Sequence, residues 1–139
     1  MADIFMWPNV IEAFQAMKFR RQYSSIILLV HKDGRIDVET LVDGHMPVDA
    51  SETLIAELVK VGHAARWFIT TNLAISNSMI WGLWQPPPVT VKDRLTNSEA
   101  RQFLMSSSLD LGEELEPQGD AEGLREALAT FFSKHPKSF

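Results

Sequence analysis

The chain of 139 residues contains no cysteine. Thiolate zinc sites, iron–sulfur clusters, cysteine nucleophiles and redox dithiols are therefore excluded, and no disulfide partner is expected. The fold must instead depend on a hydrophobic core, and a chain of this length buries about two thirds of its unfolded surface. With 45% hydrophobic and 22% charged residues, the composition predicts one globular domain over residues 1–139.

Basic residues are scarce relative to acidic ones: 13 lysines and arginines stand against 18 aspartates and glutamates, for a formal net charge of −5. Because sequence-independent binding to a phosphate backbone needs a basic face, this balance disfavours a nucleic-acid partner. Acidic residues gather between Asp110 and Glu122, with no base among them. We interpret that stretch as a solvated connection.

Targeting and membrane signals are also missing. No lysine or arginine precedes Lys18, which is unlike the start of a secretory or mitochondrial leader. The run from residue 67 to residue 91 carries no charge, but polar residues and three consecutive prolines interrupt it, so it does not suit a bilayer span. We therefore expect a cytoplasmic protein with no membrane partner.

Catalytic and phosphate-binding motifs are absent as well. The seven glycines form neither a G-x-G-x-x-G nor a G-x-x-x-x-G-K-[ST] loop. The three serines at 106–108 lack the Gly-x-Ser-x-Gly frame of a nucleophile elbow. We therefore predict no catalytic residue, no cofactor and no resident metal.

A β-hairpin is the clearest local signal in the sequence. Two apolar runs flank Asp33–Gly34, a pair that suits a two-residue primed turn. This turn predicts that Leu29 faces Val38. In the same register Ile27 faces Thr40. The first run is apolar on both faces and should lie inside the sheet, whereas the second alternates and should have one wet face or lie nearer an edge.

Four segments combine helical spacing of apolar residues with a side chain suited to cap the helix N-terminus. In three of them a glutamate at the third helical position completes a capping box. The predicted helices are 10–22 capped by Asn9, 51–67 capped by Asp49, a short helix capped by Thr96, and a last helix capped by Asp120.

Further strands are expected at 69–75, 78–84 and 89–93, with the prolines at 86–88 in a connection. The order of elements predicts an α+β fold, a two-layer sandwich with an antiparallel sheet of about 4–5 strands and 3–4 helices. This order resembles that of small profilin-like or roadblock-like sandwiches.

Tryptophan is concentrated at the ends of the uncharged run, at Trp67, Trp81 and Trp84. Residues 81 and 84 of one strand point to opposite faces, so one ring can lie in the core while the other stays accessible. An exposed ring beside a stiff proline segment suits a protein interface. We predict protein-binding residues at Trp81, Trp84, Gln85 and Pro87; the alternative is that both rings fill the core.

Lys18, Arg20 and Arg21 form a small basic patch beside Phe19 and Tyr23. Cations next to aromatic rings can hold a phosphate or stack on a base, so the three cations are candidate nucleic-acid or phosphate contacts. Cations also favour the negative end of a helix dipole, which offers a purely structural explanation. With the acidic net charge, nucleic acid is the less favoured partner.

A histidine, His31, lies near Asp33 and Asp37 in the predicted hairpin. A histidine beside carboxylates can act as a general base, which is the catalytic interpretation. The alternative is a partly buried strand histidine, which we favour because no nucleophile accompanies it.

A second polar cluster comprises Asp43, His45, Asp49 and Glu52. Such a set can bind a divalent metal, although its spacing matches no known ligand motif. A turn at Asp43 and a helix cap at Asp49 explain the same residues without a metal.

The sequence best fits a non-catalytic protein-binding module. It would act as a small regulator, adaptor or inhibitor of a larger assembly, binding another protein or a second copy as a homodimer through its sheet edge and residues 81–91. Two alternatives stay open: a nucleic-acid-associated accessory protein, and a small metal-dependent hydrolase that uses His31 or the cluster at 43–52.

Overall fold

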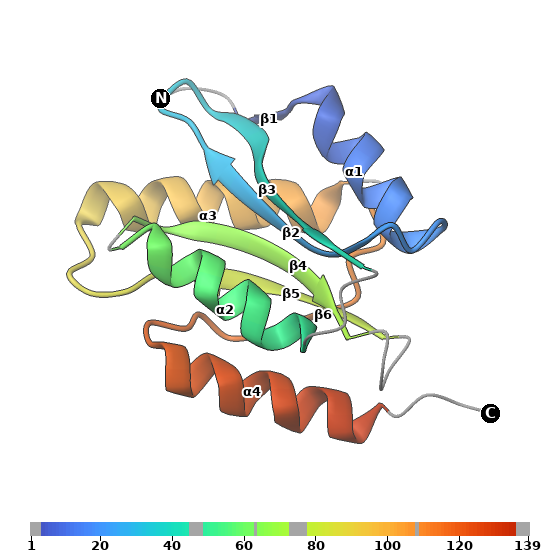
Figure 1. Cartoon of the computed structure of the whole chain (residues 1–139). Helices are drawn as coiled ribbons and strands as arrows, with labels where there is room; N and C mark the ends of the chain where they lie inside the picture. The colour runs from blue at the N-terminus through green and yellow to red at the C-terminus, as the bar shows by residue number, and fades with distance from the viewer. Residues whose placement is uncertain (1–3, 45–48, 63, 73–77, 108, 136–139) are drawn as a thin grey trace.

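A computed structural model describes residues 4–44, 49–62, 64–72, 78–107 and 109–135. Over these ranges it contains four helices and a sheet of six strands in the order β1-β3-β2-β4-β5-β6 (Figure 1). In chain order the elements are β1 (Phe5–Met6), α1 (Pro8–Lys18), β2 (Tyr23–Val30), β3 (Arg35–Asp43), α2 (Ala50–Lys60), β4 (Arg66–Thr71), β5 (Met79–Trp84), α3 (Val91–Ser106), β6 (Glu113–Glu114) and α4 (Ala121–Lys134).

The sheet is mixed, so the α+β class is confirmed but the wholly antiparallel sheet of 4–5 strands is wrong. β3, β2, β4 and β5 pair antiparallel, while the edge strands β1 and β6 pair parallel to β3 and β5. Each edge strand has two residues, too few for an alternating pattern to show in the sequence. β6 also lies inside the acidic stretch that we interpreted as a solvated connection.

Helices cover both faces of the sheet, so the predicted two-layer arrangement is wrong. Ile26 and Leu28 of β2 pack in a core with α1 and α3, whereas Ile27 packs in a second core with α2 and α4. In Figure 1, α2 and α4 lie next to each other while α3 passes behind the strands. The central position of β2 is as predicted from its apolar residues on both faces.

The hairpin of β2 and β3 forms with a shifted register. Ile27 pairs with Thr40 as predicted, but Leu29 pairs with Asp37 rather than Val38. The register changes between Ile27 and Leu28, and the extra residue is Glu39 of β3, which makes a β-bulge. The connection between the strands is correspondingly longer than a two-residue turn. It is closed by a hydrogen bond from the His31 N–H to the Arg35 carbonyl at 2.8 Å.

Two of the predicted helix caps are confirmed. The Asp49 carboxylate accepts from the backbone N–H groups of Ser51 and Glu52 at 2.8 and 3.3 Å, and Asp120 likewise caps α4. α2 nevertheless ends at Lys60 rather than near 67, because Gly62 adopts a positive φ of 67° that terminates a helix. The residues beyond it are thereby released to form β4.

The other two caps differ from the prediction. α1 begins at Pro8 after Trp7, and the Asn9 amide instead donates to Asp37 at 2.7 Å. No strand forms at 89–93: α3 begins at Val91, and its cap is Thr90, whose hydroxyl accepts from the Asp93 N–H at 3.1 Å. Thr96 therefore lies within the helix. The β-branched residues around Thr90 favoured a strand, but residues 91–95 are exposed and the Thr90 cap starts a helix there.

Candidate functional site

Helix α3 presents an apolar stripe to solvent. Only Asn97, Ala100 and Leu104 of its 16 residues are buried. Val91, Leu95 and Met105 are each more than half exposed, and their helical spacing places them on the outward side. Large apolar side chains repeated along one exposed helix are typical of a docking surface rather than of a solvated helix. We call these three residues, with Lys92 and Arg94, the α3 face.

The charges on the α3 face are available to a partner. Within the described part of the chain, the side chains of Lys92 and Arg94 form no ion pair or hydrogen bond, and both are exposed. They flank Leu95 along the first half of the helix. By contrast, Arg101 in the second half binds Glu114 through two nitrogens at 2.7 Å, and this contact raises the pKa of Arg101. The first half of the helix thus combines exposed apolar side chains with two cationic side chains that have no partner among the described residues.

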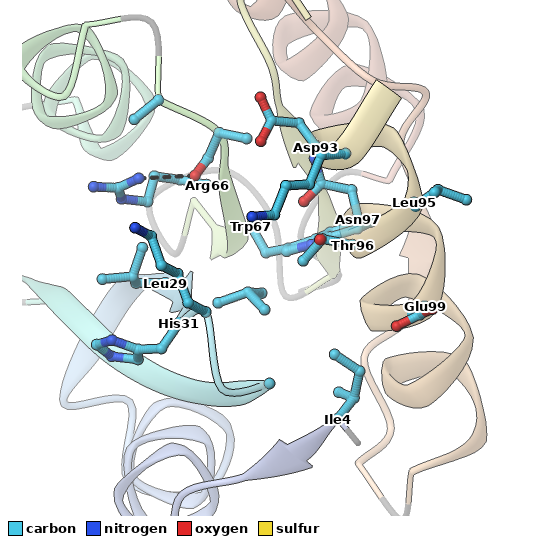
Figure 2. Close-up of a pocket in the computed structure, with 16 residues that line it drawn as sticks. Ile4, Leu29, His31, Arg66, Trp67, Asp93, Leu95, Thr96, Asn97 and Glu99 are labelled. Carbon is cyan, nitrogen blue, oxygen red and sulfur yellow. Dashed lines mark hydrogen bonds between the residues drawn. The ribbon is translucent and has the colours of Figure 1, made fainter. Parts of the chain in front are cut away.

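A cavity of about 570 Å³ lies beside the first half of α3 (Figure 2). Its walls come from the end of β2 and the turn that follows, the start of β4, and α3. Residues that line it include His31, Arg66, Trp67, Lys92, Leu95 and Asn97. The α3 face and this cavity are therefore continuous, because Lys92 and Leu95 belong to both.

Two hydrogen-bond donors in the cavity wall have no acceptor. The Trp67 Nε1 and Asn97 Nδ2 atoms are buried and have no hydrogen-bond partner among the described residues. Asn97 as a whole is only 9% exposed. Figure 2 shows Trp67 of β4 beside Asn97 and Thr96 of α3. An unsatisfied buried donor costs about 1–3 kcal/mol. This junction of β4 and α3 therefore carries a polar defect in an otherwise apolar environment.

The rest of the wall is held in place by ion pairs and packing. Arg66 binds the carboxylate of Glu39 on the bulge of β3 through two nitrogens, and it also donates to the Ala65 carbonyl at 2.9 Å. The Trp67 ring packs on Trp81 with ring centroids 5.5 Å apart. These contacts join β4 to β3 and β5 at the cavity wall.

The predicted interface tryptophans are core residues. Trp81 and Trp84 are 4% and 3% exposed, so the expectation that one ring stays accessible is wrong. They do point to opposite faces, Trp81 toward α1 and α3 and Trp84 toward α2 and α4, and helices cover both. Gln85 is half-buried and Pro87 is exposed, and their role in protein binding stays a prediction.

The basic patch of the sequence is only partly available. Lys18 binds Asp110 at 3.0 Å and lies 5.8 and 5.7 Å from the ring centroids of Phe14 and Phe19. Arg20 and Arg21 are exposed beyond the end of α1. Asp110 neutralises one of the three cations, so the positive charge available to a phosphate is smaller than the sequence suggested. The nucleic-acid contact at this patch stays a prediction.

His31 belongs to a surface network. Its Nε2 atom lies 3.5 Å from an Asp37 carboxylate oxygen and 3.3 Å from an Arg35 nitrogen. The hydrogen bond from Asn9 is the main cause that lowers the pKa of Asp37, with smaller contributions from Arg35 and His31. Asp33 is separate from this network and accepts from the Arg35 backbone N–H at 3.1 Å, which is a turn role.

The described residues of the candidate metal cluster have structural roles. Asp49 is the cap of α2, and Glu52 binds Arg125 of α4, which lowers the pKa of Glu52. His45 lies outside the described residues. Among those that are described, no group of three or more histidine, aspartate and glutamate side chains is placed to hold a metal. The same ranges contain no helix of the length and apolarity that a membrane crossing requires.

Sequence analysis missed the α3 face, because the residues around Val91 were assigned to a strand. The signal that identifies it is the capping pattern of Thr90 followed three residues later by Asp93, which marks a helix start. A helix from that point gives Val91, Leu95 and Met105 a common outward side. The α3 face can therefore be recognised only when the residues from Val91 onward are assigned to a helix.

No protein-family model and no curated protein matches the chain. Solved structures do match, and they define the fold as that of the actin-depolymerising factor and cofilin proteins. Plasmodium berghei actin depolymerization factor 2 matches with a TM-score of 0.76 at 14% identity, over 96% of this chain and 99% of that one. Streptomyces griseoflavus cofilin matches with a TM-score of 0.74 at 18% identity, over 95% and 98%. Human coactosin-like protein gives 0.69 at 10% identity, over 96% and 90%.

Proposed function

We propose that this chain is an actin-binding protein and that actin docks on the α3 face. The observation that carries the proposal is the likeness to actin depolymerization factor 2 over nearly the whole of both chains. The chain adds little to the fold beyond what those structures have, and it loses little from it. A protein-binding module is also the function class that the sequence favours, because no catalytic motif is present.

The chemistry of the α3 face supports the proposal. Val91, Leu95 and Met105 suit a helix that lays its apolar side in a hydrophobic groove of a partner. Lys92 and Arg94 would then meet acidic residues at the rim of that groove and steer the encounter. The adjoining cavity would accept a partner side chain, with Trp67 and Asn97 as donors if the wall relaxes.

Two substitutions test the proposal. Leu95→Asp places a charge in the middle of the α3 face, and Val59→Asp is a matched control on exposed α2. We expect Leu95→Asp to weaken binding to actin monomers by about tenfold or more, the effect of removing an interface anchor, and Val59→Asp to leave it unchanged. Binding is measured by titration of labelled actin monomers and by co-sedimentation with filaments. Equal binding by both variants and the unsubstituted chain would overturn the assignment of the α3 face.

The charges give a second readout. Lys92→Glu combined with Arg94→Glu should slow association and reverse the salt dependence of the rate, so that added salt speeds it, with a smaller effect on dissociation. No binding of the unsubstituted chain to actin in either form would refute the proposed function itself. A partner of this kind would make the chain a small regulator of actin assembly, and it would place the chain in the cytoplasm.

A further inference from the structure

A second exposed surface lies between α1 and β3 and shares no residue with the α3 face. It is a groove of about 390 Å³ whose floor includes Ala13 and Ala16 of α1 and whose opposite wall includes Val38 and Leu41 of β3. Both alanines are nearly buried, at 7% and 3% exposed, so a partner would contact the groove chiefly through the exposed side chains of Glu12, Arg20 and Leu41.

An exposed aromatic side chain directly precedes the groove residue Arg20 in the chain. Phe19, the residue that follows α1, is 73% exposed, and Leu41 in the groove is also exposed. Burial of a phenylalanine is favourable, so a ring held this far into water is a candidate anchor for a contact. In an isologous interface the same surface of each copy supplies both a protruding side chain and the depression that receives it.

Two oppositely charged side chains line the groove. Glu12 and Arg20 both line it, and across the described ranges neither forms an ion pair or hydrogen bond. They lie eight positions apart along the chain, with Ala16 midway between them. α1 ends at Lys18, so Arg20 lies beyond the helix, and across the described ranges no ion pair joins Glu12 and Arg20 within one chain.

We propose that this groove binds a second copy of the chain, with a two-fold axis beside Ala16. In that arrangement the two α1 helices run antiparallel, so Glu12 of each copy faces Arg20 of the other. Phe19 lies three positions beyond the axis and enters the groove of the other copy beside Ala13, three positions before it. Charge complementarity and shape thus agree on one symmetric register.

The dimer presents two α3 faces, because none of the residues that build it belongs to that surface. It therefore adds bivalence to whatever partner the α3 face binds, and it stands independently of the proposed function.

Sedimentation equilibrium over a range of concentrations tests the proposal. The unsubstituted chain should change from a mass of 15.7 kDa toward twice that value as concentration rises. Phe19→Asp should abolish the change, and Glu12→Arg or Arg20→Glu alone should raise the dissociation constant by about tenfold or more. The double variant Glu12→Arg/Arg20→Glu should restore association, since each reversed charge then meets its opposite in the other copy. Val59→Asp is the control and should associate like the unsubstituted chain.

Two results would overturn the proposal. The first is a mass of 15.7 kDa for the unsubstituted chain at every concentration up to the millimolar range. The second is association that the single charge reversals leave intact or that the double reversal fails to restore. Circular dichroism of each variant reports folding, and the double reversal distinguishes loss of the contact from loss of the fold, because an unfolded single variant is not rescued by a second charge reversal on the surface.

Discussion

Replacing Trp84 with phenylalanine should cost much less stability than replacing Trp81 in the same way. The two residues lie on one strand, are equally buried and differ in the state of the indole N–H. Trp81 Nε1 donates to the Gly112 carbonyl at 3.3 Å, whereas Trp84 Nε1 is buried without an acceptor among the described residues. The same substitution therefore removes a hydrogen bond at one site and an unpaired donor at the other.

The magnitude follows from those two states. The loss of buried ring area is the same at both positions and cancels in the comparison. Removing an unpaired buried donor recovers about 1–3 kcal/mol, and removing a long neutral hydrogen bond costs about 0.5 kcal/mol. Trp81→Phe also weakens the ring contact with Trp67, which costs up to about 1 kcal/mol. We expect Trp84→Phe to be more stable than Trp81→Phe by about 2 kcal/mol.

The free energy of unfolding from urea titration, with a common slope for both variants, measures this difference. Trp84→Ala is the control for burial, and it should lose about 3–5 kcal/mol because it leaves a cavity between β5 and the helices α2 and α4. A loss for Trp84→Phe equal to or larger than that for Trp81→Phe would refute the reasoning. It would mean that the Trp84 N–H has an acceptor in solution.

Three further predictions concern caps, backbone and charge. Asp49→Ala should lower the free energy of unfolding by about 1 kcal/mol, because two N–H groups of α2 lose their acceptor. Gly62→Ala should cost about 1 kcal/mol from its positive φ alone, and Gly112→Ala more, since its new Cβ would also lie 2.6 Å from a backbone carbonyl oxygen; urea titration ranks the two. Asn9→Ala should raise the pKa of Asp37 toward the ordinary value of about 3.9, as followed by carboxyl-carbon NMR. Because the folded pKa is lowered, this carboxylate stabilises fully above the ordinary value, and the contribution is lost as pH falls through the folded pKa, so Asn9→Ala should reduce the loss of stability in acid.

The sequence predicts local structure correctly where a residue type has one strongly preferred structural role. Asp49 and Asp120 were correctly predicted as caps, because a carboxylate before a helical run satisfies N–H groups that have no other acceptor. The central place of β2 followed from a run that is apolar on both faces. Ile27 and Thr40 pair as predicted because this part of the hairpin lies beyond the bulge at Glu39.

Errors arose where distant packing decided the outcome. The helix predicted through Trp67 stops at Gly62, and Trp67 joins the sheet because β2 and β5 offer it hydrogen bonds on both sides. The burial of Trp84 depends on α2 and α4, which lie far from it along the chain. The α3 face required the correct start of α3, which local β propensity around Thr90 obscured.

The sequence by itself determined that the chain has no cysteine chemistry, that its fold mixes helices with a hairpin, and where two of its helices begin, because those properties depend on residues close together along the chain. Tertiary structure alone decided that helices cover both sheet faces, that two-residue strands close its edges, and that Trp81 and Trp84 are inside while Leu95 and Phe19 are outside. The physical reason is that exposure is a property of the assembled layers: a side chain is buried only when residues remote in the sequence come to cover it.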